Sequence, residues 1–215
     1  MWAGHGRVQQ MVPQPNPKDL QPLVTDATRL LTAAYERDSG SPFAPTFMMH
    51  VVTVGGGSAD ELEKWFQRAI AADPDNARAC LWRLDYHSLI WYGDVNDMLK
   101  FGKECAAGHR WKHRIPMLMD QAFENWAKYS PQPDKLIGNP GTWSQMKALL
   151  QEALAHNPDT TIDRSKLLMF AVYAQDWPVA ATQMRLLGKH PSPRVFGTLD
   201  NYDRFCKLIK AHAGG

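Results

Sequence analysis

The stretch from Phe66 to Asn76 reads FQRAIAADPDN, and the stretch from Leu150 to Thr160 reads LQEALAHNPDT. In each stretch a large apolar residue is followed three positions later by an Ala, and after five more positions by a Pro. The apolar residue and the Ala share one face of a helix, where the small Ala lets a neighbouring helix approach closely. The Pro cannot continue the helix, so it marks a turn into the next one. The two copies therefore predict repeated pairs of helices that stack on one another.

Apolar residues recur at spacings of three and four through most of the chain, which is typical of amphipathic helices. Ser58 and Glu61 form a capping box at the start of one such segment. We expect helices over residues 18–37, 58–73, 76–92, 95–107, 116–126, 143–156, 159–174, 178–187 and 199–211. This pattern predicts an all-α fold of stacked antiparallel helix pairs, with about eight to ten helices.

Residues 43–54, FAPTFMMHVVTV, fit two kinds of structure. Their β-branched residues favour a strand, whereas the helices expected on both sides favour a short helix. The three glycines that follow, Gly55 to Gly57, end the segment in either case. The sequence leaves the choice between strand and helix open.

Two Pro-rich stretches predict the division of the chain into parts. Residues 1–17 are polar and Pro-rich, so we expect an irregular, flexible N-terminal segment. Residues 130–141, SPQPDKLIGNPG, form the longest stretch rich in Pro and Gly. We expect this stretch to be a linker between a first helical half, 18–129, and a second helical half, 142–215.

The spacing of the apolar residue, the Ala and the Pro resembles the second helix and the inter-repeat turn of tetratricopeptide (TPR) repeats. The signature of the first TPR helix, W-x2-L-G-x2-Y, follows neither turn, so the units resemble degenerate TPR repeats, as in some bacterial domains of unknown function. TPR proteins generally bind peptides or proteins in a concave groove. The resemblance therefore implies a TPR-like α-α superhelix and a protein-binding function. A helical bundle without repeats, whose helices end at Asp-Pro or Asn-Pro, is the alternative.

The composition limits which kinds of partner we expect this protein to bind and in which compartment we expect it to work. A formal net charge of +2 is too small to predict a nucleic-acid or membrane partner. Three Cys without a CxxC pair suit a reducing compartment, and the first residues contain no apolar run typical of a signal peptide. The most apolar short run, FMMHVVTV, is far below the ~20 residues that cross a bilayer. We expect a cytoplasmic protein without membrane insertion, and no nucleic acid as its partner.

One group of residues has the spacing of metal ligands. Cys105, His109 and His113 are four residues apart and would share a face if they lay on one continuous helix. However, Gly108 interrupts the segment, Pro116 follows it closely, and no HExxH or CxxC motif is present. We expect no catalytic residue, metal or cofactor. A metal-dependent or hydrolytic enzyme using these three side chains is the alternative function.

Two features are candidates for a partner-binding surface. Aromatic residues at helical spacing begin at Trp82, and such a stripe suits either a peptide groove or a buried helix face. Residues 100–114 contain five basic residues and one acid, with a Trp among them. This basic turn would dock an acidic protein surface or, as a further alternative, RNA. The candidate binding residues are Trp82, Tyr86, Tyr92, Lys103, Arg110, Trp111, Lys112 and Arg114.

Together these patterns predict a non-enzymatic helical-repeat module that binds another protein. A small cytoplasmic chain of this kind suits two roles. It would be a bacterial inhibitor or immunity protein that holds a secreted toxin or effector, or an adaptor that holds a component of a larger assembly.

Overall fold

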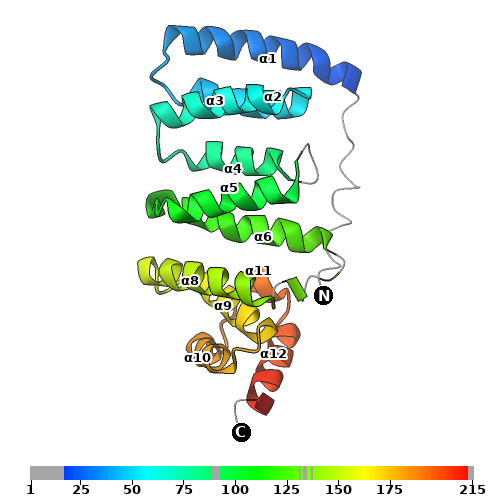
Figure 1. The fold of residues 1–215 in the computed structure, drawn as a ribbon, viewed down its shortest axis with the longest axis vertical. Coiled ribbons are helices and arrows are strands. Elements are labelled where there is room, and N and C mark those ends of the chain that lie inside the picture. The colour runs from blue at the N-terminus through cyan, green and yellow to red at the C-terminus, as the bar shows by residue number, and fades with distance from the viewer. Residues whose placement is uncertain (1–16, 89–92, 131, 133–134, 137, 213–215) are drawn as a thin grey trace. The chain divides into compact units, whose positions relative to one another are not determined.

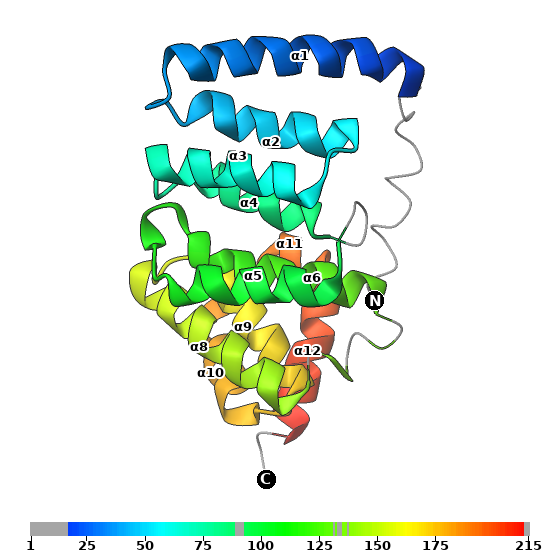
Figure 2. The same cartoon turned by 45° about the horizontal axis from the view of Figure 1, so that its top comes forward.

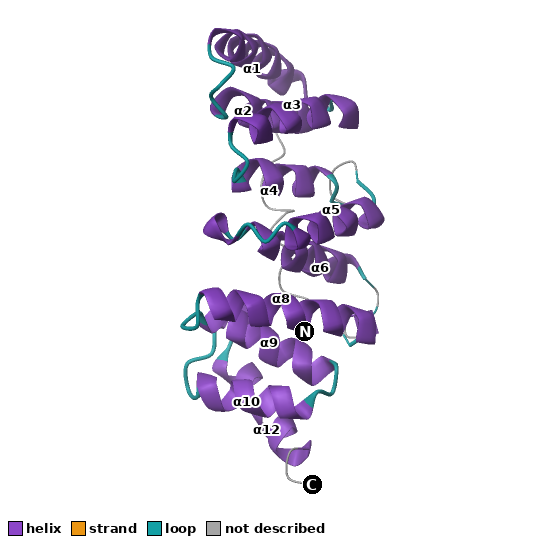
Figure 3. Ribbon diagram, turned by 60° about the vertical axis from the view of Figure 1, so that its left-hand side comes forward, coloured by secondary structure: helices purple, strands orange, loops and turns teal. Residues whose placement is uncertain are grey.

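The computed structural model describes residues 17–88, 93–130, 132, 135–136 and 138–212. In these residues the chain is helical without any strand, so the all-α prediction is confirmed (Figure 3). Apart from Pro17, which begins the first helix, the expected flexible segment 1–17 lies outside the described residues.

The described part contains eleven α-helices and two short 3-10 helices, which roughly matches the number expected (Figure 1). The helices are α1 (Pro17–Arg37), α2 (Phe43–Gly55), α3 (Ala59–Ala72), α4 (Ala77–Tyr86), α5 (Val95–Ala107), α6 (Leu118–Tyr129), α8 (Pro140–His156), α9 (Thr161–Tyr173), α10 (Trp177–Leu187), α11 (Pro193–Phe196) and α12 (Leu199–His212). The 3-10 helices η1 (Trp111–His113) and η2 (Ile115–Met117) connect α5 to α6.

The chain divides into two compact units, Met1–Ala122 and Phe123–Gly215. The boundary falls inside α6. The stretch 130–141, expected to be a linker, lies within the second unit, and its last two residues belong to the first turn of α8.

In the first unit α1 to α5 form successive layers of helices (Figure 2). α2 packs against α1, α3 and α4, so it is covered on several sides. Its buried faces are mostly apolar and its open face carries Phe43, Phe47 and His50 in place of Asp, Glu, Lys or Arg, which explains why residues 43–54 lack an amphipathic pattern. The structure therefore decides in favour of the helix for this segment. Gly56, with φ of 73°, ends it in the left-handed conformation that suits Gly.

Both Pro corners lie where the repeated stretches predict turns. α3 ends at Ala72 and α8 ends at His156, just before the two prolines. Ala69 and Ala153, the small residues of the pattern, are both fully buried. The backbone carbonyl of each corner Pro accepts a hydrogen bond from an Arg side chain: Pro74 O from Arg110, and Pro158 O from Arg164 at 2.7 Å.

Arg83 of α4 joins three helices of the first unit. Its guanidinium lies over the rings of Phe66 and Phe101, at 4.6 and 4.4 Å from their centroids. The same group forms an ion pair with Glu63 of α3, with Nε 2.9 Å from Oε2. Stacking on aromatic rings and pairing with a carboxylate offset the loss of hydration of this half-buried charge.

The core of the second unit is centred on α9, which packs against α8, α10, α11 and α12. Leu167, Leu168 and Phe170 of α9 are almost fully buried. The hydroxyl of Ser165 accepts a buried hydrogen bond from the backbone N–H of Ser192 at 2.9 Å, which ties the start of α11 to this helix. None of the helices described is long and apolar enough to span a bilayer.

Candidate functional site

An aromatic cluster extends across α2 and α4. Phe43 and Phe47 are one helical turn apart, with ring centroids separated by 4.6 Å. Phe47 meets Trp82 of α4 edge to face at 5.4 Å. The His50 ring, also on α2, stacks on Trp82 with a centroid distance of 5.2 Å and a tilt of 26°. Phe43 is 67% exposed and His50 is also exposed, so the cluster lies at the surface.

The geometry of α4 explains why its part of the cluster faces solvent. Arg78, Trp82 and Asp85 are spaced by four and three residues, so they lie on one face of the helix. Cys80 and Leu84 lie on the opposite face and are fully buried. The core therefore determines which side chains α4 turns outward.

Two charged groups flank Trp82 on this face. The guanidinium of Arg78 lies 5.7 Å from the Trp82 ring centroid, and no residue in the described part forms an ion pair with it. Asp85 is half-buried, and burial raises the pKa of its carboxyl group. No described residue donates a hydrogen bond to that carboxyl group. α2 itself contains no Asp, Glu, Lys or Arg.

We call this surface the α2–α4 face. It consists of Phe43, Phe47, His50, Arg78, Trp82 and Asp85.

Two hydrogen bonds fix the register of the helices that carry the face. Asn76 Nδ2, at the start of α4, donates to Thr46 Oγ1 of α2 at 2.8 Å. The Tyr86 hydroxyl, at the end of α4, donates to the carbonyl of Gly57 just after α2 at 3.1 Å. Because both ends of α4 are tied, the two helices that carry the face are positioned against each other before any partner binds.

The three aromatic residues that the sequence predicts for a binding surface have different positions. Trp82 lies at the centre of the α2–α4 face. Tyr86 is buried and serves to tie α4 to the turn after α2. Tyr92 lies outside the described residues.

The predicted basic turn lies on other elements, namely α5, η1 and their connections. Lys103, Lys112 and Arg114 are exposed, and Arg114 adopts a left-handed conformation with φ of 56°. Trp111 is half-buried. Arg110 binds the Pro74 carbonyl, so this side chain contributes to the α3–α4 corner.

The three side chains with metal-ligand spacing are not brought together on one helix face. α5 ends at Ala107, and His109 follows with φ of 48°, so the continuous helix that the spacing needs is absent. Cys105 is buried, whereas His109 and His113 are exposed. The hydrogen bond with Cys80, together with burial, raises the pKa of the Cys105 thiol, which keeps it protonated. Within the described residues no three Cys, His, Asp or Glu side chains form a group that could hold a metal ion.

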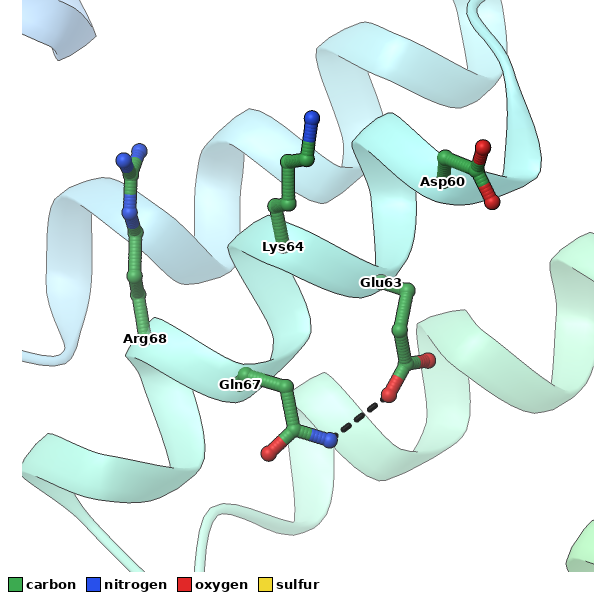
Figure 4. A pocket seen from close by; sticks show the side chains of 5 residues that line it. All are labelled: Asp60, Glu63, Lys64, Gln67 and Arg68. Atoms are coloured by element: carbon green, nitrogen blue, oxygen red, sulfur yellow. Dashed lines mark hydrogen bonds between the residues drawn. The ribbon is translucent and has the colours of Figure 1, made fainter.

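A shallow pocket on α3 is a second surface feature (Figure 4). It is lined by Asp60, Glu63, Lys64, Gln67 and Arg68, all from this one helix. Most of these groups already have partners. Gln67 Nε2 donates to Glu63 Oε1 at 2.6 Å, and the Arg68 guanidinium lies 4.3 Å from the ring centroid of Trp65. The pocket is therefore the solvated face of one helix, on which Glu63, Gln67 and Arg68 interact with neighbouring side chains.

Sequence reasoning missed most of the α2–α4 face. Phe43, Phe47 and His50 have the spacing of a helix face, but the segment that contains them was compatible with a strand. Arg78 and Asp85 share their helix face with Trp82, which was the only one of the six predicted. No protein-family model and no curated protein matches this chain.

Proposed function

We propose that this chain is a degenerate TPR-type helical-repeat protein that binds another protein through its α2–α4 face. The observation that carries the proposal is an exposed aromatic cluster flanked by Arg78 and Asp85, neither of which has an ion-pair partner in the described part. Aromatic and Arg side chains dominate the binding energy of protein interfaces. The packing of α2 against both α3 and α4 also fits stacked helical repeats.

The size of the expected effect follows from the exposure of the aromatic side chains. Burying a Phe or Trp side chain that is exposed in the free protein contributes about 1.5–3 kcal/mol. A partner that covers Phe43 would therefore lose roughly 10- to 100-fold in affinity when this ring is removed.

Our more specific proposal for the role of this protein rests on the sequence alone. We propose a non-enzymatic role in the bacterial cytoplasm, either as an inhibitor or immunity protein for a toxin or effector, or as an adaptor in an assembly. The absence of a recognisable catalytic motif in the sequence motivates this role. The metal-dependent enzyme is less well supported, because α5 ends before His109.

Affinity capture from cells of the source organism tests the proposal, with Phe43→Glu as the variant. Leu199→Glu is the matched control, because Leu199 is 62% exposed and lies on α12 in the second unit. We expect the wild type and Leu199→Glu to retain the same protein, and Phe43→Glu to lose it. The purified pair should then form a stoichiometric complex in size-exclusion chromatography. Equal retention by Phe43→Glu, with circular dichroism showing all chains folded, would contradict the proposal.

A further inference from the structure

The charged groups of the α2–α4 face limit the chemistry of its partner. Arg78 and Asp85 are seven residues apart on α4, which separates them by about 10 Å along the helix axis. Trp82 lies between them, with the His50 ring stacked on it. The face thus has a cation towards one end, an aromatic centre and a carboxyl group towards the other end.

Of the two charged groups, the carboxylate of Asp85 lies in the less favourable environment. It is half-buried, and no described residue donates a hydrogen bond to it or forms an ion pair with it. A partly desolvated carboxylate without a donor is unfavourable, and burial accordingly raises its pKa. A cation supplied by a partner would remove this cost.

Arg78 complements Asp85 at the other end of the face. Its guanidinium lies near the Trp82 ring and has no carboxylate partner among the described residues. α2 carries no Asp, Glu, Lys or Arg that would compete for a ligand there. A carboxylate of a partner can therefore pair with Arg78 in the planar geometry that a guanidinium favours.

We propose that the partner of the α2–α4 face is a dipolar protein segment. It carries a basic side chain that pairs with Asp85, an apolar or aromatic side chain that packs on Trp82 and His50, and an acidic side chain that pairs with Arg78. This inference rests on the proposed protein-binding function and adds the chemistry of the bound segment.

The separation of the two charges also predicts their spacing in the partner. An extended segment rises about 3.3 Å per residue, so its acidic and basic residues would be about three positions apart. A helical segment would need about seven positions. A single-stranded nucleic acid could stack on Trp82, but the carboxylate of Asp85 would repel its phosphates, so the face favours a protein segment.

Selection from a display library of random peptides of about twelve residues tests the inference, with the purified full-length chain as bait. We expect the enriched peptides to contain Lys or Arg and Asp or Glu at a constant spacing, with an apolar residue between them. Against the Asp85→Asn variant the basic preference should disappear. Against Arg78→Gln the acidic preference should disappear, and the apolar preference should remain in both cases.

Fluorescence anisotropy with the most enriched peptide measures how much affinity each variant loses. We expect Asp85→Asn and Arg78→Gln each to weaken binding about tenfold. Asp60→Asn, which removes an exposed acid of α3 outside the face, should leave the affinity unchanged. Circular dichroism and urea unfolding confirm that each variant is folded.

The outcomes distinguish failure of the dipolar-segment proposal from failure of the protein-binding proposal. Peptides that require Phe43 but show the same charge preferences with Asp85→Asn and Arg78→Gln would overturn the dipolar segment and leave the protein-binding function standing. If no peptide binding is reduced by Phe43→Glu, both proposals fail. Binding of a 12-nucleotide oligouridine that Phe43→Glu abolishes would also overturn the dipolar segment, in favour of nucleic acid.

Discussion

Asp176 has two structural roles in the second unit. One carboxylate oxygen accepts the N–H of Val179 at 3.3 Å and caps α10. The other accepts hydrogen bonds from Lys147 Nζ at 2.9 Å and Trp143 Nε1 at 3.3 Å, both on α8. Burial raises the pKa of Asp176, but these hydrogen bonds and the charge of Lys147 outweigh burial and lower the pKa overall.

The lowered pKa predicts how stability depends on pH. A carboxyl group with a lower pKa in the folded state stabilises the protein above its unfolded pKa of about 3.9, and this contribution is lost as pH falls through the folded pKa. Asp176→Asn keeps a capping oxygen but loses the pair with Lys147. Because that pair is partly exposed, we expect a loss of about 1 kcal/mol at neutral pH.

Urea unfolding at neutral pH and at a pH of about 3 measures this difference. The gap between the wild type and Asp176→Asn should shrink at the lower pH. Asp159→Asn, which changes an exposed acid in the turn after α8, is the control and should have little effect. A gap that stays constant with pH would show that the Asp176 carboxylate does not contribute in the way described.

At the scale of the helices, the link between α2 and α4 can be tested through Asn76. Its Oδ1 accepts the N–H of Ala79 at 3.0 Å and caps α4, while its Nδ2 donates to Thr46 Oγ1. Asn76→Asp retains the cap and loses the donor, so we expect it to cost about 1 kcal/mol. Asn76→Ala loses both functions and should cost about 2–3 kcal/mol.

A double-mutant cycle with Thr46→Val isolates the bond between the helices. Unfolding free energies from urea titration should show that Asn76→Asp has little further effect once Thr46 lacks its hydroxyl. Fully additive effects would mean that the bond between Asn76 and Thr46 does not contribute to the stability of the first unit.

The helices also show where sequence patterns are sufficient. α5 begins at Val95 and ends at Ala107, as predicted, because Asp94 caps its start and Gly108 ends it. The capping box is confirmed in part, since Ser58 Oγ accepts the N–H of Glu61 at 3.2 Å. Such signals act within a few residues, so they can be read from the sequence. α2 has a Gly signal at its end but no side-chain cap at its start, and its packing among neighbouring helices favours a helix over a strand.

At the scale of the whole molecule, each of the two units has a core of its own. Leu84 in the first unit and Leu168 in the second are both fully buried. Replacing either Leu by Ala leaves a cavity and should cost about 2–5 kcal/mol.

Hydrogen exchange measured by mass spectrometry shows which helices each loss of stability affects. We expect Leu168→Ala to increase exchange in α8 to α12 and to leave α1 to α4 close to the wild type. Leu84→Ala should have the opposite distribution. An equal increase throughout the chain for both variants would indicate a single cooperative unit instead of two.

The α2–α4 face shows the limit of prediction from sequence. Helical spacing placed Trp82 among the candidates, but the same spacing also selected Tyr86, which is buried. Spacing shows which residues share a helix face, and it does not show which neighbour covers that face. The basic turn was selected by its charges and by Trp111 among them, although Arg110 binds the Pro74 carbonyl.

Local sequence patterns are enough to predict helices for most of the described residues, the ends of many of these helices and the Pro corners that join them. These features depend on local forces, such as helix periodicity, capping and the missing N–H of Pro. Packing between helices, in contrast, makes residues 43–54 a helix and places Phe47 and His50 of α2 against Trp82 of α4. These features depend on contacts between residues about thirty or more positions apart, and packing against other helices determines them.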